Sequence, residues 1–294
     1  MALYGTDGVQ LRLPTHLDLP CSEEEVMPPW DFRIPDHTDL PDSDGEIVEN
    51  TLDLPQALLL TDTIAPILRG LHPDGQCLVG GNSAIYWRFT EPPLKGAIGP
   101  DWFYVPDVPP LLVGGKRRRS YVLWKEHVPP RIVMEFVSGD GAKERDRTPE
   151  TGKLWVYEMG VKADFYVIYD VERAHVEMYH REGMGYRLVT PNARRHLEIP
   201  MLGVELGIWN GTFMEMQLPW LRWWDLRGEI LPLSSEKLGE ETRRADHEAR
   251  RAYAADRRAD DSDRRADDSD RRAESLAAKL RSLGIDPDDI AGSA

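Results

Sequence analysis

Three side chains have residue types and a spacing that suit chemistry at a phosphate group. Asp101 follows Pro100 and leads into the aromatic run Trp-Phe-Tyr-Val, and Glu135 is the one acid within the apolar run 131–137. Lys153 comes later, near the start of a predicted helix. Two carboxylates on neighbouring strands with a lysine close by are typical of sites that hold a hard divalent cation.

The same three residues also have simpler explanations, and these differ in weight. An acid at a strand start is often a surface residue, so Asp101 alone carries little information, and Lys153 alone is an ordinary first-turn lysine. Glu135 favours function, because an acid inside an apolar central strand is costly to bury without a metal or another cation. Mg²⁺ keeps several waters, so two carboxylates suffice, and the backbone C=O of Phe136 is a candidate third oxygen.

A second Pro-Asp pair, Pro106-Asp107, competes with Asp101 for the metal-binding role. Asp107 is followed by Val-Pro-Pro, and two consecutive prolines cannot donate hydrogen bonds to a central strand ladder. Five or six strand residues at about 3.3 Å each would also separate the two acids by roughly 17–20 Å, too far to share one ion. We therefore predict that Asp101 is the metal-binding acid and that Asp107 lies in a loop.

The elements that must position these residues form an α/β pattern. The strand 131–137 is apolar on both faces except at Glu135, which predicts a central strand of a sheet covered on both sides. A helix is predicted to open at Thr148-Pro149-Glu150 and to run to about Met159. A buried helix is predicted over 53–71, with a break or start at Pro66. Further strands are predicted at 76–89, 101–105, 120–124, 164–170, 174–180, 186–190 and 204–209. The aromatic segment 219–225 is predicted to close the core.

The composition limits the classes of function. The net charge of −15 argues against a general nucleic-acid-binding surface, and residues 1–50 alone hold twelve acids and two arginines. Bases gather in the middle of the chain, at Lys116, Arg117, Arg118, Arg119, Lys125, Arg131, Lys143, Arg145 and Arg147. A local basic rim beside an acidic site would still fit a nucleic-acid substrate, although the run 116–119 reads equally well as a solvated loop.

Cysteine usage and hydropathy give an expected location. Only Cys21 and Cys77 are present, which favours a reducing compartment, the cytoplasm. The first residues show no basic region followed by an apolar core, so no signal peptide is expected. No apolar run is long enough to predict a membrane span.

The end of the chain is a seven-residue repeat. Residues 257–263 (RRADDSD) recur identically at 264–270, and a third copy begins at Arg271. One heptad position holds alanine or leucine, and the position three residues later holds small residues or leucine. This is a coiled-coil pattern in which the core side chains are mostly small. Asp-to-Arg pairs four residues apart would add about 0.2–0.5 kcal/mol each, so a solvated single helix is an equal alternative to a multimer.

Together, several pieces resemble a known family. They are Pro100-Asp101 with 102–105, then 120–124, Pro129-Pro130, 133–138, Asp146, Lys153-x-x-x-Tyr157, Gly160-Val161 and 165–170. Their order and spacing resemble the Uma-two family of restriction-endonuclease-like proteins, in the PD-(D/E)XK nuclease superfamily. The resemblance covers about residues 50–230. The superfamily's lysine is absent from the Glu135 strand, which fits a lysine supplied by the following helix.

The resemblance implies an α/β fold with a mixed β-sheet flanked by helices, dependence on Mg²⁺ or Mn²⁺, and DNA endonuclease activity. Carried over by position, it implies Asp101 and Glu135 as metal ligands and Lys153 as the catalytic lysine. The predicted organisation is an acidic, Pro-rich arm over 1–50, a nuclease-like domain over 51–232 and a heptad-repeat helical tail over 233–294. The alternative is a catalytically silent nuclease-like scaffold that forms homo-oligomers through its C-terminal helix.

Overall fold

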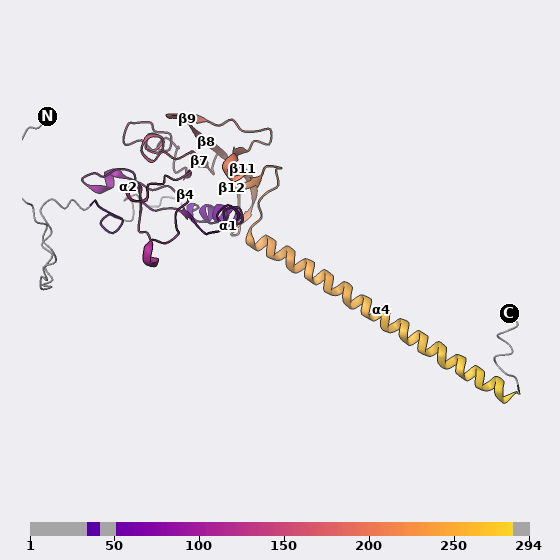
Figure 1. Ribbon diagram of the computed structural model, residues 1–294. Helices are drawn as coiled ribbons and strands as arrows, with labels where there is room; N and C mark the ends of the chain where they lie inside the picture. Colours follow the sequence, from indigo (N-terminus) through magenta and orange to yellow (C-terminus); the bar gives the residue numbers. More distant parts are fainter. Residues whose placement is uncertain (1–33, 42–50, 285–294) are drawn as a thin grey trace, which may run out of the picture. The chain divides into compact units, whose positions relative to one another are not determined.

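The computed structural model describes residues 34–41 and 51–284 (Figure 1). The chain divides after Pro35, and every element below belongs to the part that follows. Most of the expected arm over 1–50 and the last ten residues of the expected tail lie outside the described residues. None of the described helices is both long and apolar enough to cross a membrane.

A six-stranded mixed sheet forms the centre of the domain, in the order β1-β4-β6-β7-β8-β9. β6 and β7 are parallel, and the other neighbours are antiparallel. All five residues of β6 are buried, as expected for a central strand. The strands are β1 (Cys77–Gly80), β4 (Trp102–Pro106), β6 (Ile132–Phe136), β7 (Phe165–Asp170), β8 (His175–Glu182) and β9 (Gly185–Leu188). The predicted mixed α/β architecture is confirmed.

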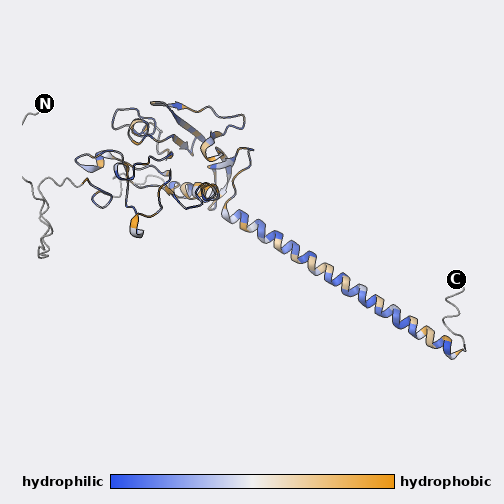
Figure 2. Cartoon of the chain, in the orientation of Figure 1, coloured by the Kyte–Doolittle hydropathy of each residue, from blue (hydrophilic) through white to orange (hydrophobic). Residues whose placement is uncertain are grey.

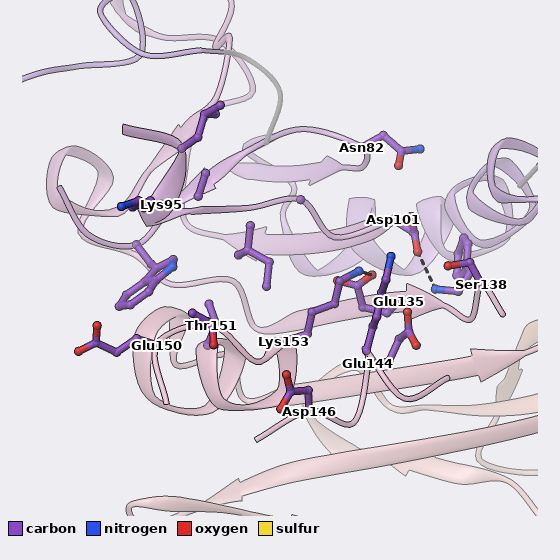
Figure 3. Close-up of a pocket in the computed structure, with 18 of the residues that line it drawn as sticks. Asn82, Lys95, Asp101, Glu135, Ser138, Glu144, Asp146, Glu150, Thr151 and Lys153 are labelled. Atoms are coloured by element: carbon purple, nitrogen blue, oxygen red, sulfur yellow. Dashed lines mark hydrogen bonds and ion pairs between the residues drawn. The ribbon is translucent and has the colours of Figure 1, made fainter. Parts of the chain in front are cut away.

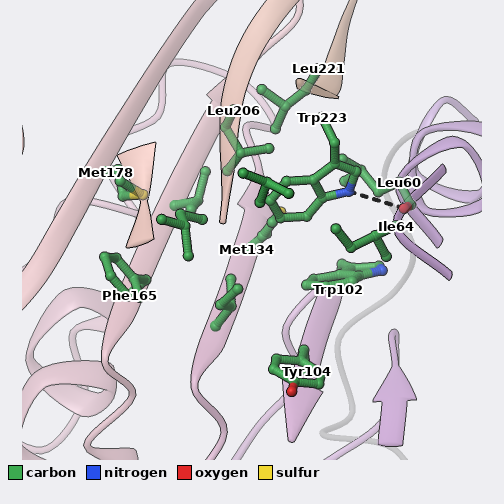
Figure 4. Close-up of a cluster of buried hydrophobic side chains, with 14 of the residues drawn as sticks. Leu60, Ile64, Trp102, Tyr104, Met134, Phe165, Met178, Leu206, Leu221 and Trp223 are labelled. Carbon is green, nitrogen blue, oxygen red and sulfur yellow. Dashed lines mark hydrogen bonds between the residues drawn. The ribbon is translucent and has the colours of Figure 1, made fainter. Parts of the chain in front are cut away.

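One face of this sheet packs against a helix and a second sheet. The helix is α1 (Asp53–Leu71), which contains Pro66 without ending there, and the sheet has the order β10-β11-β12. Its strands are β10 (Leu197–Ile199), β11 (Val204–Phe213) and β12 (Met216–Asp225). Figure 4 shows the core between these layers, where the indole N–H of Trp223 donates to the Leu60 carbonyl at 3.0 Å. The aromatic segment 219–225 therefore closes the core, as predicted.

The side chains of β4 and β6 alternate between two cores, and this alternation places the acids. Trp102 and Met134 belong to the core with α1, whereas Phe103 and Val133 belong to a core on the opposite face. Because the strand repeat is two residues, Asp101 and Glu135 belong to that opposite face as well. The domain also contains a third sheet, made of β3 (Ala97–Ile98), β2 (Ile85–Tyr86) and β5 (Tyr121–Val122). Its other short elements are η1 (Pro93–Gly96), η2 (Val113–Gly115), η4 (Pro200–Leu202) and α2 (Leu123–Glu126).

The helix between β6 and β7 starts later than predicted. Residues 148–151 form a turn, and α3 (Lys153–Trp155) begins only after Gly152 and continues directly into the π-helical segment η3 (Val156–Val161). The prediction of a helix opening at Thr148 was therefore wrong. The Asp146 side chain accepts from both the backbone N–H and the hydroxyl of Thr148, which holds this stretch in a turn instead.

The C-terminal helix α4 (Ser234–Ser282) begins against the domain and then runs without burying a residue. Leu233, just before it, is buried, Ser234 bonds to Asp62 of α1, and the Arg222 guanidinium lies 3.3 Å from Glu236. Figure 2 shows that most of α4 is hydrophilic, with paler residues recurring along it. The predicted helix in the tail is confirmed over these residues.

We expect a chain that ends at Gly239 to remain folded. It keeps Leu233, Ser234 and Glu236, and the helix removed beyond Gly239 buries nothing. Chemical denaturation should give a free energy of unfolding within about 0.5 kcal/mol of the full chain. A chain ending at Leu231 is the matched control and should be less stable, because it loses the buried Leu233 and the partner of Arg222. Unfolding of the Gly239 truncation would show that the tail is part of the domain.

Candidate active site

The strand register brings Asp101 and Glu135 together. Trp102 pairs with Met134 in the antiparallel β4–β6 ladder, so the next pair outward is Asp101 with Glu135. Directly opposite residues in such a ladder present their side chains on the same face, with Cβ atoms about 4.5–5.5 Å apart. Two carboxylates separated by 34 positions in the sequence thus become neighbours.

Asp101 is held by the backbone of β6. Its N–H donates to the Met134 carbonyl at 3.0 Å, and its Oδ2 accepts from the Phe136 N–H at 2.6 Å. In the part of the chain that the structure describes, Oδ1 accepts no hydrogen bond. A close approach at Gly81 supports this strand start, because a Cβ there would lie 2.3 Å from the Asp101 carbonyl oxygen.

Glu135 is fully enclosed, and two donors satisfy its carboxylate. Only 1% of the residue is exposed. The Lys153 Nζ lies 2.8 Å from Oε2, and the Tyr157 hydroxyl donates to Oε1 at 2.5 Å. Each oxygen keeps a further lone pair for another ligand. Lys153 and Tyr157 are four residues apart and project from one side of the same helix.

The loop before α3 fixes the position of Lys153. The Asp146 carbonyl accepts from the N–H of Leu154 at 3.0 Å, and Gly152 donates to the Thr148 carbonyl at 2.8 Å. Gly152 must be glycine for steric reasons, since a Cβ there would lie 2.5 Å from the Asp146 carbonyl oxygen and 2.6 Å from the Thr148 nitrogen. Asp146, a further candidate from the sequence, therefore supports the loop with its backbone and side chain.

Burial raises the pKa of both acids. Desolvation raises the pKa of Asp101 to about 7, although the hydrogen bond from Phe136 lowers it. Desolvation also raises the pKa of Glu135 to about 7, against the attraction of Lys153. For Lys153, burial lowers the pKa, but attraction by Glu135 outweighs it and holds the pKa well above its usual value. Lys153 therefore remains a cation at neutral pH.

The three residues line a cavity of about 750 Å³ (Figure 3). Sequence reasoning missed several of its other residues, among them Asp53, Lys95 and Glu144. Glu144 is 1% exposed, and its Oε2 accepts no hydrogen bond from the described residues. It comes from the loop 138–147, which the sequence identifies only as polar, so no pattern predicts its burial. For Tyr157 the spacing of four from Lys153 was a usable signal.

The basic residues expected around the site are mostly used elsewhere. Lys143 does line the cavity, and Arg88 and Lys95 join it from the β2–β3 region. Arg118, in the run 116–119, bonds to Glu126 and to the carbonyls of Pro109 and Pro110. None of the four residues 116–119 lines the cavity, so the reading as a solvated, anchored loop is the better one.

The side chains of the cavity suit a hard divalent cation that keeps several waters better than a metal ion enclosed by protein ligands alone. Within the described ranges, no three His, Cys, Asp or Glu side chains gather in a group able to hold a metal ion. Asp101 and Glu135 offer two carboxylates, and the buried Oε2 of Glu144 accepts no hydrogen bond from the described residues. One or two carboxylates with several waters are the usual environment of Mg²⁺. Asp107, by contrast, is exposed beyond the end of β4 and does not line the cavity.

Comparisons with known proteins identify related sequences and structures. A family model described as "Uma2: Putative restriction endonuclease" matches residues 31–217, which is more than half of the chain. One similar solved structure is that of "a putative nuclease belonging to DUF820" from Anabaena variabilis, with a TM-score of 0.34 and 12% sequence identity. The similarity covers 50% of this chain and 73% of that chain. No curated protein matches the chain.

Replacement of Gly152 by alanine should destabilise the domain and displace Lys153. The new methyl group would overlap the backbone of Asp146 and Thr148, and overpacking of this kind costs about 1–3 kcal/mol. Denaturant melts of Gly152→Ala against wild type measure the loss. Gly70→Ala, a substitution with no atom within 4 Å of the new Cβ, is the matched control. Equal stability of the Gly152→Ala variant would mean that this loop is not tightly packed.

The stability of the metal-free protein should fall as pH rises from about 4 to about 7. In this interval the folded state retains protons on Asp101 and Glu135 that the unfolded chain, with ordinary acid pKa values of 3.8 and 4.5, has released. Asp101→Asn removes one of these groups. The free energy of unfolding of the Asp101→Asn variant minus that of wild type should therefore rise by on the order of 1–2 kcal/mol between about pH 5 and about pH 8.

Urea melts in EDTA at the two pH values measure this difference. Asp107→Asn, which changes an exposed acid outside the cavity, serves as the control and should show no comparable rise. A constant difference between Asp101→Asn and wild type across this pH range would refute a raised pKa at Asp101.

Proposed function

The chain belongs to the Uma2 restriction endonuclease family, and from that premise we propose that it is a divalent-metal-dependent DNA endonuclease that hydrolyses phosphodiester bonds. The observation that carries the proposal is the meeting of Asp101, Glu135 and Lys153 in one cavity. They come from the position just before β4, the second-last residue of β6 and the start of α3. Nothing in the packing of the sheet requires this set of charges, and its burial is costly.

Asp101 and Glu135 are the proposed ligands of Mg²⁺, or of Mn²⁺ in its place. Asp101 offers Oδ1, since Oδ2 is occupied by the Phe136 N–H. The N–H and C=O of one strand residue point to the same neighbouring strand, so the Phe136 carbonyl is directed toward Asp101 and is the proposed third protein oxygen. When bound, the cation supplies charge neutralisation at a phosphate and lowers the pKa of a bound water.

Lys153 is the proposed catalytic lysine, and its protonation defines what it can do. Because Glu135 keeps its pKa high, Lys153 donates hydrogen bonds and cannot act as a base at neutral pH. Its role is to hold the attacking water and to stabilise the negative charge that develops on the phosphate oxygens. Tyr157 keeps the Glu135 carboxylate oriented through the hydrogen bond to Oε1.

The surroundings of the cavity support a polyanionic substrate. Arg88, Lys95 and Lys143 contribute cationic side chains to its lining, although the whole chain carries a net charge of −15. The same lining holds six acids, among them Glu150, which pairs with Arg88 at 2.8 Å, so attraction of a phosphate there also needs the bound divalent cation, while the acidic remainder of the chain disfavours nonspecific binding. DNA is the proposed substrate because of the family assignment. The free thiol of Cys77 is consistent with the proposed cytoplasmic location.

A second candidate function is a catalytically silent scaffold that forms homo-oligomers through α4. Its support is that Lys153 and Tyr157 already satisfy both oxygens of Glu135 without any metal. In that case the charged set would be a buried ion pair of structural value. The two functions differ in metal affinity, because a silent scaffold has no reason to bind Mn²⁺ at this site.

We expect the purified protein to nick or linearise plasmid DNA with Mg²⁺ or Mn²⁺, and EDTA to stop the reaction. Asp101→Asn should abolish both cleavage and Mn²⁺ binding measured by calorimetry, because it removes the free carboxylate oxygen. Asp107→Asn is the matched control, six residues away and outside the cavity, and should leave both nearly unchanged. Glu135→Ala should lose Mn²⁺ binding as well.

Two results would contradict this assignment in different ways. A loss of Mn²⁺ binding in Asp107→Asn with retention in Asp101→Asn would show that the wrong acid has been assigned. A folded wild-type protein that neither binds Mn²⁺ nor cuts any form of DNA, over varied metal and pH, would favour the scaffold function.

A further inference from the structure

α4 is too long and too exposed to be explained by the domain it follows. It has 49 residues and none of them is buried. Leu238, Leu276 and Leu283 are 62–74% exposed. A helix that packs against nothing is stabilised either by many side-chain pairs along its surface or by a partner.

Pairs within the helix do not account for it. Arg244 and Glu248 form an ion pair at 3.1 Å. Among the described residues, no ion pair forms at the four expected Asp-to-Arg spacings, which are 260 to 264, 261 to 265, 267 to 271 and 268 to 272. The charges in the repeat are therefore available to a partner.

The heptad register separates apolar and charged residues into columns. Taking Ala245 as position a, this column begins and ends with leucine, at Leu238 and Leu280, and holds alanine between them. Position d is Glu241 and Glu248 in the first two heptads and then holds small residues and leucine, at Ala255, Ser262, Ser269, Leu276 and Leu283. From Ala252 to Leu283 the a and d columns together form one continuous seam of small and apolar residues.

The columns that flank this seam carry opposite charges. Position g is basic in every heptad of α4, at Lys237, Arg244, Arg251, Arg258, Arg265, Arg272 and Lys279. Position e is never basic, and in the middle of the helix it is Asp256, Asp263 and Asp270. Positions e and g border the interface of a coiled coil and set the orientation of its helices.

We propose that α4 pairs with α4 of a second copy of this chain, parallel and in register. In this arrangement each g residue faces the e residue five positions later in the partner. Arg251, Arg258 and Arg265 then face the partner's Asp256, the partner's Asp263 and the partner's Asp270, which gives six ion pairs per dimer. An antiparallel pair would set the two basic g columns against each other, and the aspartates against aspartates.

The parallel orientation brings the two domains to the same end of the coil. Ser234 bonds to Asp62, and Glu236 to Arg222, so each helix starts directly at its own domain. The inference stands on the tail alone, and it holds whether or not the cavity cuts DNA.

Disulfide trapping in the full-length chain tests the orientation. Ser262→Cys and Ser269→Cys, made separately, each place a thiol at position d, where equivalent residues of a parallel, in-register pair lie within disulfide reach. Both should give a covalent dimer under mild oxidation. Ser275→Cys, at the outer position c, is the matched control and should crosslink several-fold less, with the wild-type chain giving the background from Cys21 and Cys77.

Charge reversal tests the pairing itself. Sedimentation equilibrium should give a dimer mass for wild type, and changing Arg251, Arg258 and Arg265 to Glu should weaken association by roughly tenfold or more. Adding Asp256, Asp263 and Asp270 changed to Lys should restore it, because the pairs are then attractive again in the parallel orientation only. Circular dichroism checks that each variant keeps its helix.

Three outcomes would overturn the proposal. A wild-type chain that stays monomeric at every concentration would show that α4 is a solitary charged helix. Crosslinking of one of the two position-d variants but not the other would indicate an antiparallel pair. Failure of the combined charge swap to restore association would mean that the e and g columns do not face each other.

Discussion

A carboxylate buried in the middle of the main sheet determines how this domain is arranged. Glu135 lies on a strand whose other residues are all apolar, and it requires donors that the sheet cannot supply. Lys153 and Tyr157 provide them from the helix that crosses from β6 to β7. The position of that helix, the loop that precedes it and the cavity beside it all follow from this requirement.

One face of the sheet stabilises the domain, and the other face carries the candidate site. On one face, α1 and the β10–β12 sheet bury large apolar side chains such as Trp102 and Trp223. On the other face, the odd-numbered residues of β4 and β6 alternate into a core that opens at one end into the cavity. The apolar face offsets the cost of holding Asp101 and Glu135 in partly dehydrated positions.

Local pattern was enough to predict the central strands and the two acids. An acid in an apolar run and a Pro-Asp before an aromatic run are visible in the sequence, and pairing of their strands then brings them together. The start of α3 was misplaced because the turn at Thr148 depends on the Asp146 side chain, which competes with helix capping. Glu144 and Lys95 could not be foreseen, since their places depend on how long loops fold back over the cavity. The short strand β10 was also missed, because three residues carry too little periodicity.

The π-helical turn of η3 makes the number of residues between β6 and β7 as important as their types. Lys162 donates to the carbonyl of Tyr157, five residues earlier, so this turn holds one more residue than an α-helical turn would. A deletion inside this turn can close it as an ordinary α-helical turn and leave the register of β7 unchanged. A deletion after the turn would instead pull β7 along by one position. Every β7 side chain would then change faces, and Tyr166, now in the core on the Glu135 side, would point into the core with α1. Deletions between the turn and β7 should consequently be far less tolerable than substitutions of the same residues.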